Sequence, residues 1–142
     1  MENLTADEMI SRLQLAPHPE GGHFRETWRD PQENDGRSFG TAILFLLKSG
    51  EVSHWHRVDA AEIWHFYAGA PLELLKAEKE GSPVEKQVLG TDISTGHSPQ
   101  IVIPAGYWQS AKSTGDWTLV GCTVSPGFEF SGFELADQGW EP

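Results

Sequence analysis

Three residues near the middle of the chain have the types and spacing that acid–base or metal chemistry requires. His54 and His56 are two residues apart in a strand-like stretch, and Glu62 follows after a five-residue link. Side chains of a strand alternate between its two faces, so both imidazoles are predicted to share one face. Glu62 opens the next predicted strand, which would return its carboxylate beside them. The sequence therefore predicts one polar site made of two imidazoles and a carboxylate.

Two chemistries are open for these residues. Two imidazoles and a carboxylate can bind one divalent first-row metal such as Mn, Fe, Ni or Zn, with the amide of Gln109 as a weak fourth ligand. Without a metal, Glu62 would hold the tautomer of His56, and the two would act as an acid/base pair. Tyr107 lies two residues before Gln109 on the same predicted face, and in that mechanism it would be the proton donor on the opposite side of the substrate.

Further residues are predicted to contact a ligand. Trp64 shares the strand face of Glu62, which directs that carboxylate inward beside a large aromatic ring. Trp64 and Trp108 are candidates for stacking on the ligand, with core packing as the open alternative. Arg25 or Glu26 would reach over the mouth of the site to orient a polar group. The alternative for these two residues is a solvated edge strand.

The elements that must position this site are mostly strands. Thr5 and Glu8 form a capping box that begins a short helix, which Pro17 ends. Short apolar and β-branched runs between turn residues then predict strands near 23–28, 39–48, 52–56, 62–67, 72–78, 84–89, 99–103, 107–112, 117–124 and 127–135. Many short strands with regular turns indicate an all-β sandwich or barrel. The run Ile43–Leu47 is apolar on both faces, which is typical of a strand buried between two sheets.

Length and charge restrict the class of protein. The 142 residues fit a single domain over 1–142. The net charge of −11 repels phosphate backbones and anionic lipids, so neither a nucleic acid nor a membrane is predicted as a partner. We find no pattern of a signal peptide, which makes the cytoplasm the expected compartment. Cys122 is the only cysteine and is expected to be a small buried apolar residue.

Two motifs of the chain resemble those of the cupin superfamily. The first is Gly50-x3-His54-x-His56-x5-Glu62-x6-Gly69. The second is Gly96-x7-Pro104-x-Gly106-x2-Gln109, in which a metal-binding histidine normally stands at the position of Gln109. Three longer stretches narrow the resemblance to the cupin 5 family, a domain of unknown function: residues 17–28, 62–69 and 119–130.

The resemblance implies an all-β fold, the cupin double-stranded β-helix or jelly roll, with one short N-terminal helix. It also implies a homodimer and a small-ligand pocket at the mouth of the barrel. The expected function is a small-molecule-binding cupin, metal-assisted in one version, acting on a sugar or a nucleotide-like metabolite. Two alternatives stay open: a metal-free sugar epimerase or isomerase using His56 with Glu62, and a non-enzymatic binding or storage-like protein.

Overall fold

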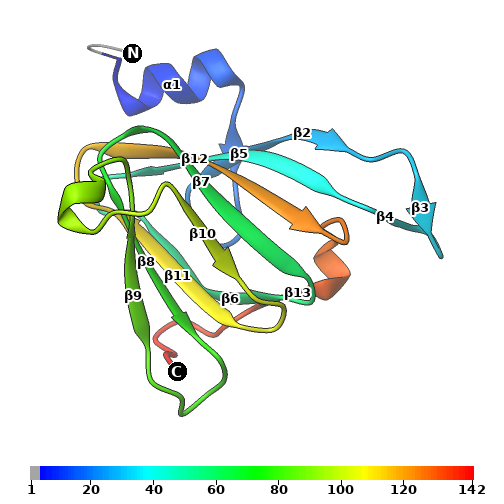
Figure 1. The fold of residues 1–142 in the computed structure, drawn as a ribbon. Coiled ribbons are helices and arrows are strands. Elements are labelled where there is room, and N and C mark those ends of the chain that lie inside the picture. Colours follow the sequence, from blue (N-terminus) through cyan, green and yellow to red (C-terminus); the bar gives the residue numbers. More distant parts are fainter. Residues whose placement is uncertain (1–3) are drawn as a thin grey trace.

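The computed structural model describes residues 4–142, so the first three residues of the predicted 1–142 domain lie outside the described part. The elements are α1 (Ala6–Leu13), β1 (Ala16–Pro17), β2 (His23–Arg29), β3 (Glu33–Asn34), β4 (Arg37–Ser38), β5 (Thr41–Lys48), β6 (Val52–Val58), β7 (Ala61–Gly69), β8 (Leu72–Ala77), β9 (Glu85–Leu89), η1 (Ile93–Thr95), β10 (Gln100–Ile103), β11 (Trp108–Ser113), β12 (Trp117–Ser125), η2 (Phe130–Gly132) and β13 (Phe133–Leu135). The prediction of an all-β jelly roll with one short N-terminal helix is confirmed (Figure 1).

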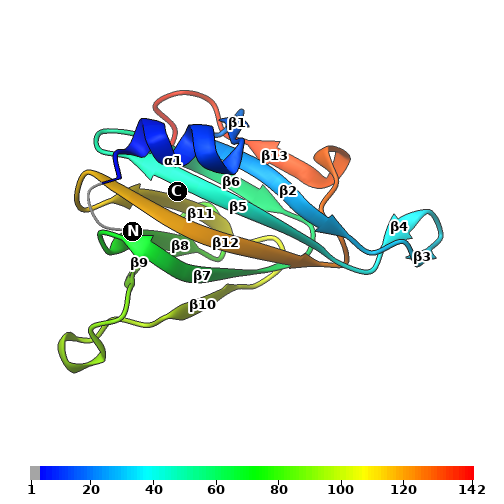
Figure 2. The same cartoon turned by 90° about the horizontal axis from the view of Figure 1, so that it is seen from above.

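Two antiparallel sheets face each other and form the barrel. The six-stranded sheet has the order β1-β2-β5-β12-β7-β10, and the five-stranded sheet has the order β13-β6-β11-β8-β9. β12 lies between β5 and β7, so each sheet joins strands that are far apart in the sequence, as in jelly rolls. The β3–β4 hairpin projects from one end of the barrel (Figure 2). This topology brings β2, β5, β7 and β12 together at that end.

The main core lies between the two sheets. Trp64 is 1% exposed and packs edge-on against Phe45, with ring centroids 5.9 Å apart. Phe66 packs against the same cluster, and Glu62 is buried on the same face of β7. The predicted alternation of β7 is therefore confirmed. Each large apolar side chain buried here stabilises the fold by about 1.5–3 kcal/mol.

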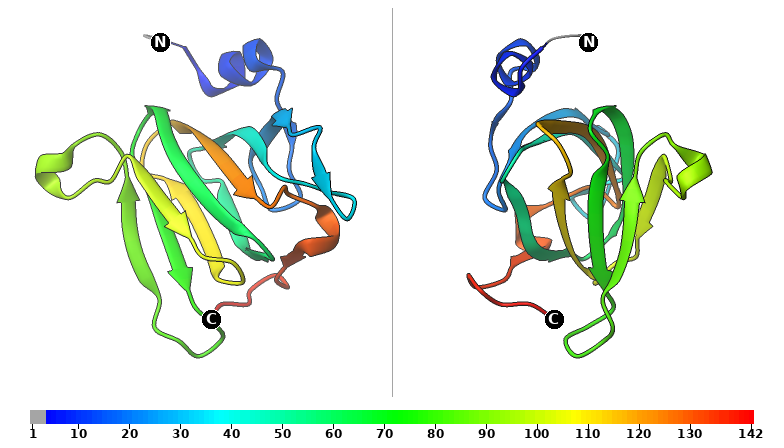
Figure 3. Two further views of the ribbon diagram at one scale, coloured as in Figure 1. Left: turned by 45° about the vertical axis from the view of Figure 1, so that its right-hand side comes forward. Right: turned by 90° about the vertical axis from the view of Figure 1, so that its left-hand side faces the viewer.

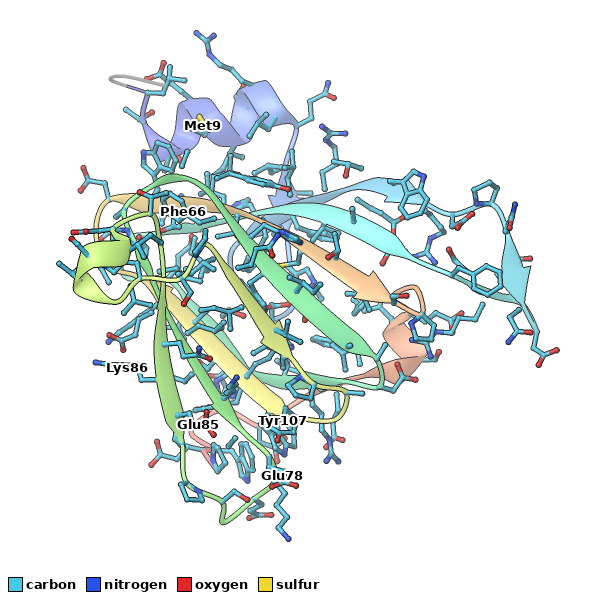
Figure 4. All side chains as sticks on the ribbon, viewed as in Figure 1. Met9, Phe66, Glu78, Glu85, Lys86 and Tyr107 are labelled. Atoms are coloured by element: carbon cyan, nitrogen blue, oxygen red, sulfur yellow. The ribbon has the colours of Figure 1, made fainter. Side chains whose placement is uncertain are left out.

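The N-terminal helix covers the outer face of the six-stranded sheet (Figure 2). Thr5 caps the N-terminus of α1, and its hydroxyl oxygen accepts a hydrogen bond of 3.1 Å from the Glu8 backbone N–H. Met9, labelled in Figure 4, is buried against the sheet in a second apolar cluster that contains Leu46. The run Ile43–Leu47 was predicted to be buried between two sheets. This is wrong for the outer face of the strand, which packs against α1 and not against a sheet.

The strand predicted over residues 127–135 is also corrected. Only β13 is a strand there, preceded by a loop and the short helix η2 (Figure 3). The Gly127 N–H donates to the Ser38 carbonyl oxygen at 2.7 Å, and the Phe128 N–H donates to the Thr41 hydroxyl at 3.0 Å. These bonds tie the backbone to the end of the barrel and replace the ladder bonds of a strand. Residues 126–132 therefore form a wall beside the tip of β12.

Two predictions concern what surrounds the chain. None of the helices within residues 4–142 is long and apolar enough to cross a bilayer. The homodimer stays a prediction. Several large apolar side chains are about half exposed and would be available to such an interface: Trp28, Phe39, Tyr67 and Val102.

Candidate functional site

A cavity of about 390 Å³ opens at the end of the barrel where β12 finishes. Its size lies within the range of small-ligand sites. Its buried polar lining consists of Thr41 and four titratable residues, His18, Glu20, His56 and Glu62. The more exposed polar lining consists of Glu26, Arg29 and Glu129, and the apolar lining includes Phe24, Phe128, Phe130 and Phe133. The cavity therefore combines buried titratable groups with an aromatic wall.

A β-bulge decides which histidine of β6 enters the cavity. Gln109 pairs with His56 and Ala111 pairs with Ser53, so two residues of β6 face one residue of β11. The extra residue reverses the alternation, because a bulge re-aims the side chains that follow it. His56 and Ser53 therefore point inward, whereas His54 points outward. The ring Nε2 of His54 donates to the Asp137 carbonyl oxygen at 2.8 Å.

The loop before β2 carries a carboxyl group to this bulge. The His54 backbone N–H donates to the Glu20 carbonyl oxygen at 2.8 Å, which fixes the loop against β6. Gly21 and Gly22 follow with φ of 109° and 78°, values that favour glycine. A Cβ at Gly21 would also collide with the Val52 carbonyl oxygen. These two glycines let the chain turn so tightly that the Glu20 side chain enters the cavity.

The side chains of His56 and Glu20 lie next to each other in the lining of the cavity. The two side chains are 2% and 9% exposed, and His56 Nε2 lies 3.5 Å from Glu20 Oε2. His56 Nδ1 lies 2.8 Å from the His54 carbonyl oxygen. Because a carbonyl oxygen can only accept, Nδ1 carries the hydrogen and Nε2 of the neutral ring is free to accept. The Ser53 hydroxyl donates to Glu20 Oε2 from the other side.

Burial keeps both members of this pair uncharged. It raises the pKa of Glu20 to about 8, an effect that the Ser53 hydrogen bond opposes. It also lowers the pKa of His56, although the nearby carboxylate of Glu62 opposes this shift. At neutral pH Glu20 therefore retains its proton, while His56 is an unprotonated base. His18 lies 3.3 Å from the other Glu20 oxygen, and burial lowers its pKa to about 4.

Glu62 belongs to a separate hydrogen-bond chain. The indole Nε1–H of Trp64 donates to Gln109 Oε1 at 2.8 Å, and Gln109 Nε2 donates to Glu62 Oε1 at 2.8 Å. An indole only donates, so it fixes which end of the amide faces the carboxylate. The Cys122 thiol also donates to Glu62. Burial raises the pKa of Glu62 to about 6, so this group is mostly ionised at neutral pH.

The sequence and the fold place the chain in a family. Residues 7–136 match the family described as Cupin superfamily (DUF985). The chain belongs to this cupin family. A crystal structure of a protein from Shewanella oneidensis is 39% identical over 95% of this chain and 86% of that chain, with a TM-score of 0.90. A hypothetical protein from Leishmania major is 31% identical over 95% of this chain and 89% of that chain, with a TM-score of 0.88.

More distant cupins share the fold alone. Oxalate decarboxylase from Bacillus subtilis is 14% identical over 84% of this chain and 29% of that chain, with a TM-score of 0.64. No curated protein matches the chain significantly. The comparisons therefore establish a cupin without giving its substrate.

The metal-ligand set predicted for this cupin is not assembled. Within residues 4–142, no group of three or more His, Cys, Asp and Glu side chains is arranged to hold a metal ion. The bulge turns His54 out of the cavity, which corrects the prediction that it shares a face with His56. Gln109 Oε1, the predicted weak ligand, accepts the indole hydrogen of Trp64. The donors of this chain therefore do not fit the metal that the family resemblance implies.

This geometry predicts weak metal binding. After incubation with Mn, Fe, Ni or Zn and desalting, we expect less than about one-tenth of an equivalent of metal per chain, because two of the four predicted ligands are unavailable. Elemental analysis by mass spectrometry measures this. Retention of close to one equivalent that His56→Ala abolishes would contradict the expectation, and His54→Asn controls for binding at the surface.

The other predicted site residues divide between the cavity and elsewhere. Glu26 lines the cavity, whereas Arg25 donates to the Leu13 carbonyl oxygen at 2.8 Å on the helix side of the sheet. Tyr107 packs against the main core and is outside the lining (Figure 4). Trp108 packs on Trp140, with ring centroids 4.5 Å apart, and Arg57 lies over its ring. Trp64 belongs to the main core, and its link to the site is the hydrogen bond that its indole donates to Gln109.

Sequence reasoning missed several residues of the lining. Glu20 and His18 lie in the stretch 17–28 that carried the family resemblance, and the pair Gly21-Gly22 was the available signal for a tight turn at that point. The Arg29 side chain lies in the cavity lining because a second bulge, between Glu26 and Trp28, reverses the alternation of side chains between the two faces of β2. The aromatic side chains between residues 128 and 133 were not predicted to line the site, because residues 127–135 were interpreted as a strand.

Proposed function

We propose that this cupin binds a small metabolite in the cavity and moves a proton on it with His56 and Glu20. The observation that carries the proposal is the contact of 3.5 Å between His56 Nε2 and Glu20 Oε2 on the cavity wall. A base that lacks its proton lies beside an acid that holds one. Environments that push the pKa values of neighbouring groups in opposite directions are typical of acid–base sites.

The reaction class follows from the adjacency of the two groups. His56 Nε2 takes a proton from a carbon next to a carbonyl, and the Glu20 carboxyl gives its proton to the carbonyl oxygen, so an enol forms. In an α-hydroxy carbonyl compound this enol is an enediol. His56 then gives its proton to the former carbonyl carbon and Glu20 takes the proton of the other hydroxyl, so the carbonyl group moves by one carbon and both side chains are regenerated. A carbonyl oxygen and the hydrogen on the neighbouring carbon are close together in one substrate, which suits an acid and a base in contact. The proposed activity is therefore that of an isomerase.

This mechanism differs from the one predicted from the sequence. Glu20 takes the place that Glu62 was given as the partner of His56, and it also replaces Tyr107 as the proton donor. Glu62 remains on the cavity wall, held by Gln109. Its role in the proposal is to bind the ligand.

Solvent deuterium exchange tests the proposed function. The protein is incubated in heavy water with a panel of keto-sugars and keto acids, and proton NMR follows the signals next to each carbonyl. Loss of one such signal, faster than in a protein-free control, supports the proposal. If all signals persist while mass spectrometry of the native protein finds a molecule that co-purifies with it, the protein is a binding cupin without this activity.

A further inference from the structure

The charged side chains around the cavity are mostly acidic. Glu26, Glu62 and Glu129 lie in the lining beside the uncharged Glu20, whereas Arg29 is the only lysine or arginine in it among the described residues. Arg29 is paired with an acidic neighbour. Its Nη2 donates to Glu26 Oε1 at 2.7 Å and to the Phe128 carbonyl oxygen at 2.9 Å. Its Nε donates to Glu26 Oε2 at 3.2 Å, so the Glu26 carboxylate balances the charge of the one guanidinium in the lining.

Glu62 is the buried carboxylate that this arrangement leaves without a positive partner. Its residue is 7% exposed, and the neutral amide of Gln109 donates a hydrogen bond to Oε1 at 2.8 Å. Its other polar neighbours include the neutral thiol of Cys122 and the uncharged ring of His56. Within residues 4–142, no lysine, arginine or histidine side chain forms an ion pair with it. Buried carboxylates are normally paired with a cation, so a bound molecule can supply the missing charge.

A second part of the cavity lining is aromatic. Phe128, Phe130 and Phe133 pack on one another with ring centroids 4.9–5.9 Å apart. Phe24 completes this wall from β2 and lies 4.5 Å from the His18 ring. Faces of aromatic rings attract cations, and the attraction increases where water is excluded. A buried carboxylate and phenylalanine rings in the lining of one cavity are complementary to an organic cation.

We propose that the ligand carries a cationic nitrogen, which lies between the Glu62 carboxylate and the aromatic wall of Phe24, Phe128, Phe130 and Phe133. This inference rests on the proposed function, because it names the class of molecule that the same cavity binds. The substrate is then a small carbonyl compound with an ammonium or substituted ammonium group. Its cation fixes it on Glu62, and its carbonyl faces His56 and Glu20.

Three probes of one shape and different charge test the charge preference. Choline carries a trimethylammonium group, neohexanol has carbon in place of the nitrogen, and tert-butylacetate is an anion of the same shape. We expect choline to bind about tenfold more tightly than neohexanol, and tert-butylacetate to bind more weakly than both. Ligand-observed NMR titrations at neutral pH measure the three affinities.

Two variants assign the preference to the proposed site. Glu62→Gln keeps the size of the side chain and should abolish most of the difference between choline and neohexanol. Phe130 is 55% exposed, so Phe130→Leu should fold, and it should weaken choline binding by about threefold. Phe39→Leu is the matched control, because Phe39 is 49% exposed and lies outside the cavity lining.

The outcomes separate this inference from the proposed function. Equal or tighter binding of neohexanol or tert-butylacetate would overturn the inference, as would a choline preference that survives in Glu62→Gln. Binding of none of the three probes would also overturn it. Deuterium exchange into uncharged or anionic keto compounds would then still support proton transfer by His56 and Glu20.

Discussion

His56→Asn slows deuterium exchange into the keto compound that the wild-type protein accepts by about a hundred- to ten-thousand-fold. The asparagine amide can still donate a hydrogen bond to the His54 carbonyl oxygen, as His56 Nδ1 does at 2.8 Å. It lacks the second ring nitrogen, which faces Glu20. The variant should therefore bind the substrate normally and fail in the proton transfer. Proton NMR gives the exchange rate, and a titration of the unreactive variant gives the affinity.

His54→Asn is the matched control for this experiment. His54 is only two residues away, but its ring bonds to the Asp137 carbonyl oxygen outside the cavity. Its replacement should leave the exchange rate within about twofold of the wild type, since no step of the proton transfer uses it. Equal losses in the two variants would contradict the assignment of the base to His56 and also the bulge that separates the two rings.

The general fold could be predicted because its signals are local. The capping box at Thr5 fixes where α1 begins, and the turn residues fix where most strands end. The alternation of β7 places Glu62, Trp64 and Phe66 on one buried face, as its pattern indicates. Each of these features depends on residues a few positions apart, which a single sequence contains.

The site could be predicted only in part, because bulges change the alternation on which face assignments depend. One extra residue in β6 places the side chains of His54 and His56 on different faces, and one in β2 places the side chain of Arg29 in the cavity lining. A bulge depends on the register with the neighbouring strand, which spacing within one strand does not contain. The partnership of Glu20 with His56 likewise requires a long-range backbone bond from His54 to the loop.

Glu20→Gln increases the free energy of unfolding by about 2–4 kcal/mol at pH 8 and changes it little near pH 5. Burial raises the pKa of Glu20 from 4.5 to about 8 on folding. Below about pH 4.5 the group is protonated in both states, and its contribution to stability is fully present. As the pH rises toward 8, the unfolded chain releases this proton and the folded chain retains it, so stability is lost by about 1.4 kcal/mol per pH unit. Glutamine has no such proton, so the advantage of the variant grows over this window.

Urea unfolding of the two proteins at several pH values measures this difference, and the slope against pH separates it from a general change in packing. Glu26→Gln is the matched control. The ion pair of Glu26 with Arg29 is about two-fifths exposed to solvent, so its loss should change stability by less than about 1 kcal/mol. A constant difference between Glu20→Gln and the wild type from pH 5 to pH 8 would contradict the raised pKa.

The same variant should lose the deuterium exchange, because its amide can donate a hydrogen bond to His56 Nε2 but cannot deliver a proton to a carbonyl oxygen. A variant that is more stable and inactive is expected where a buried acid is retained for its chemistry at the expense of stability.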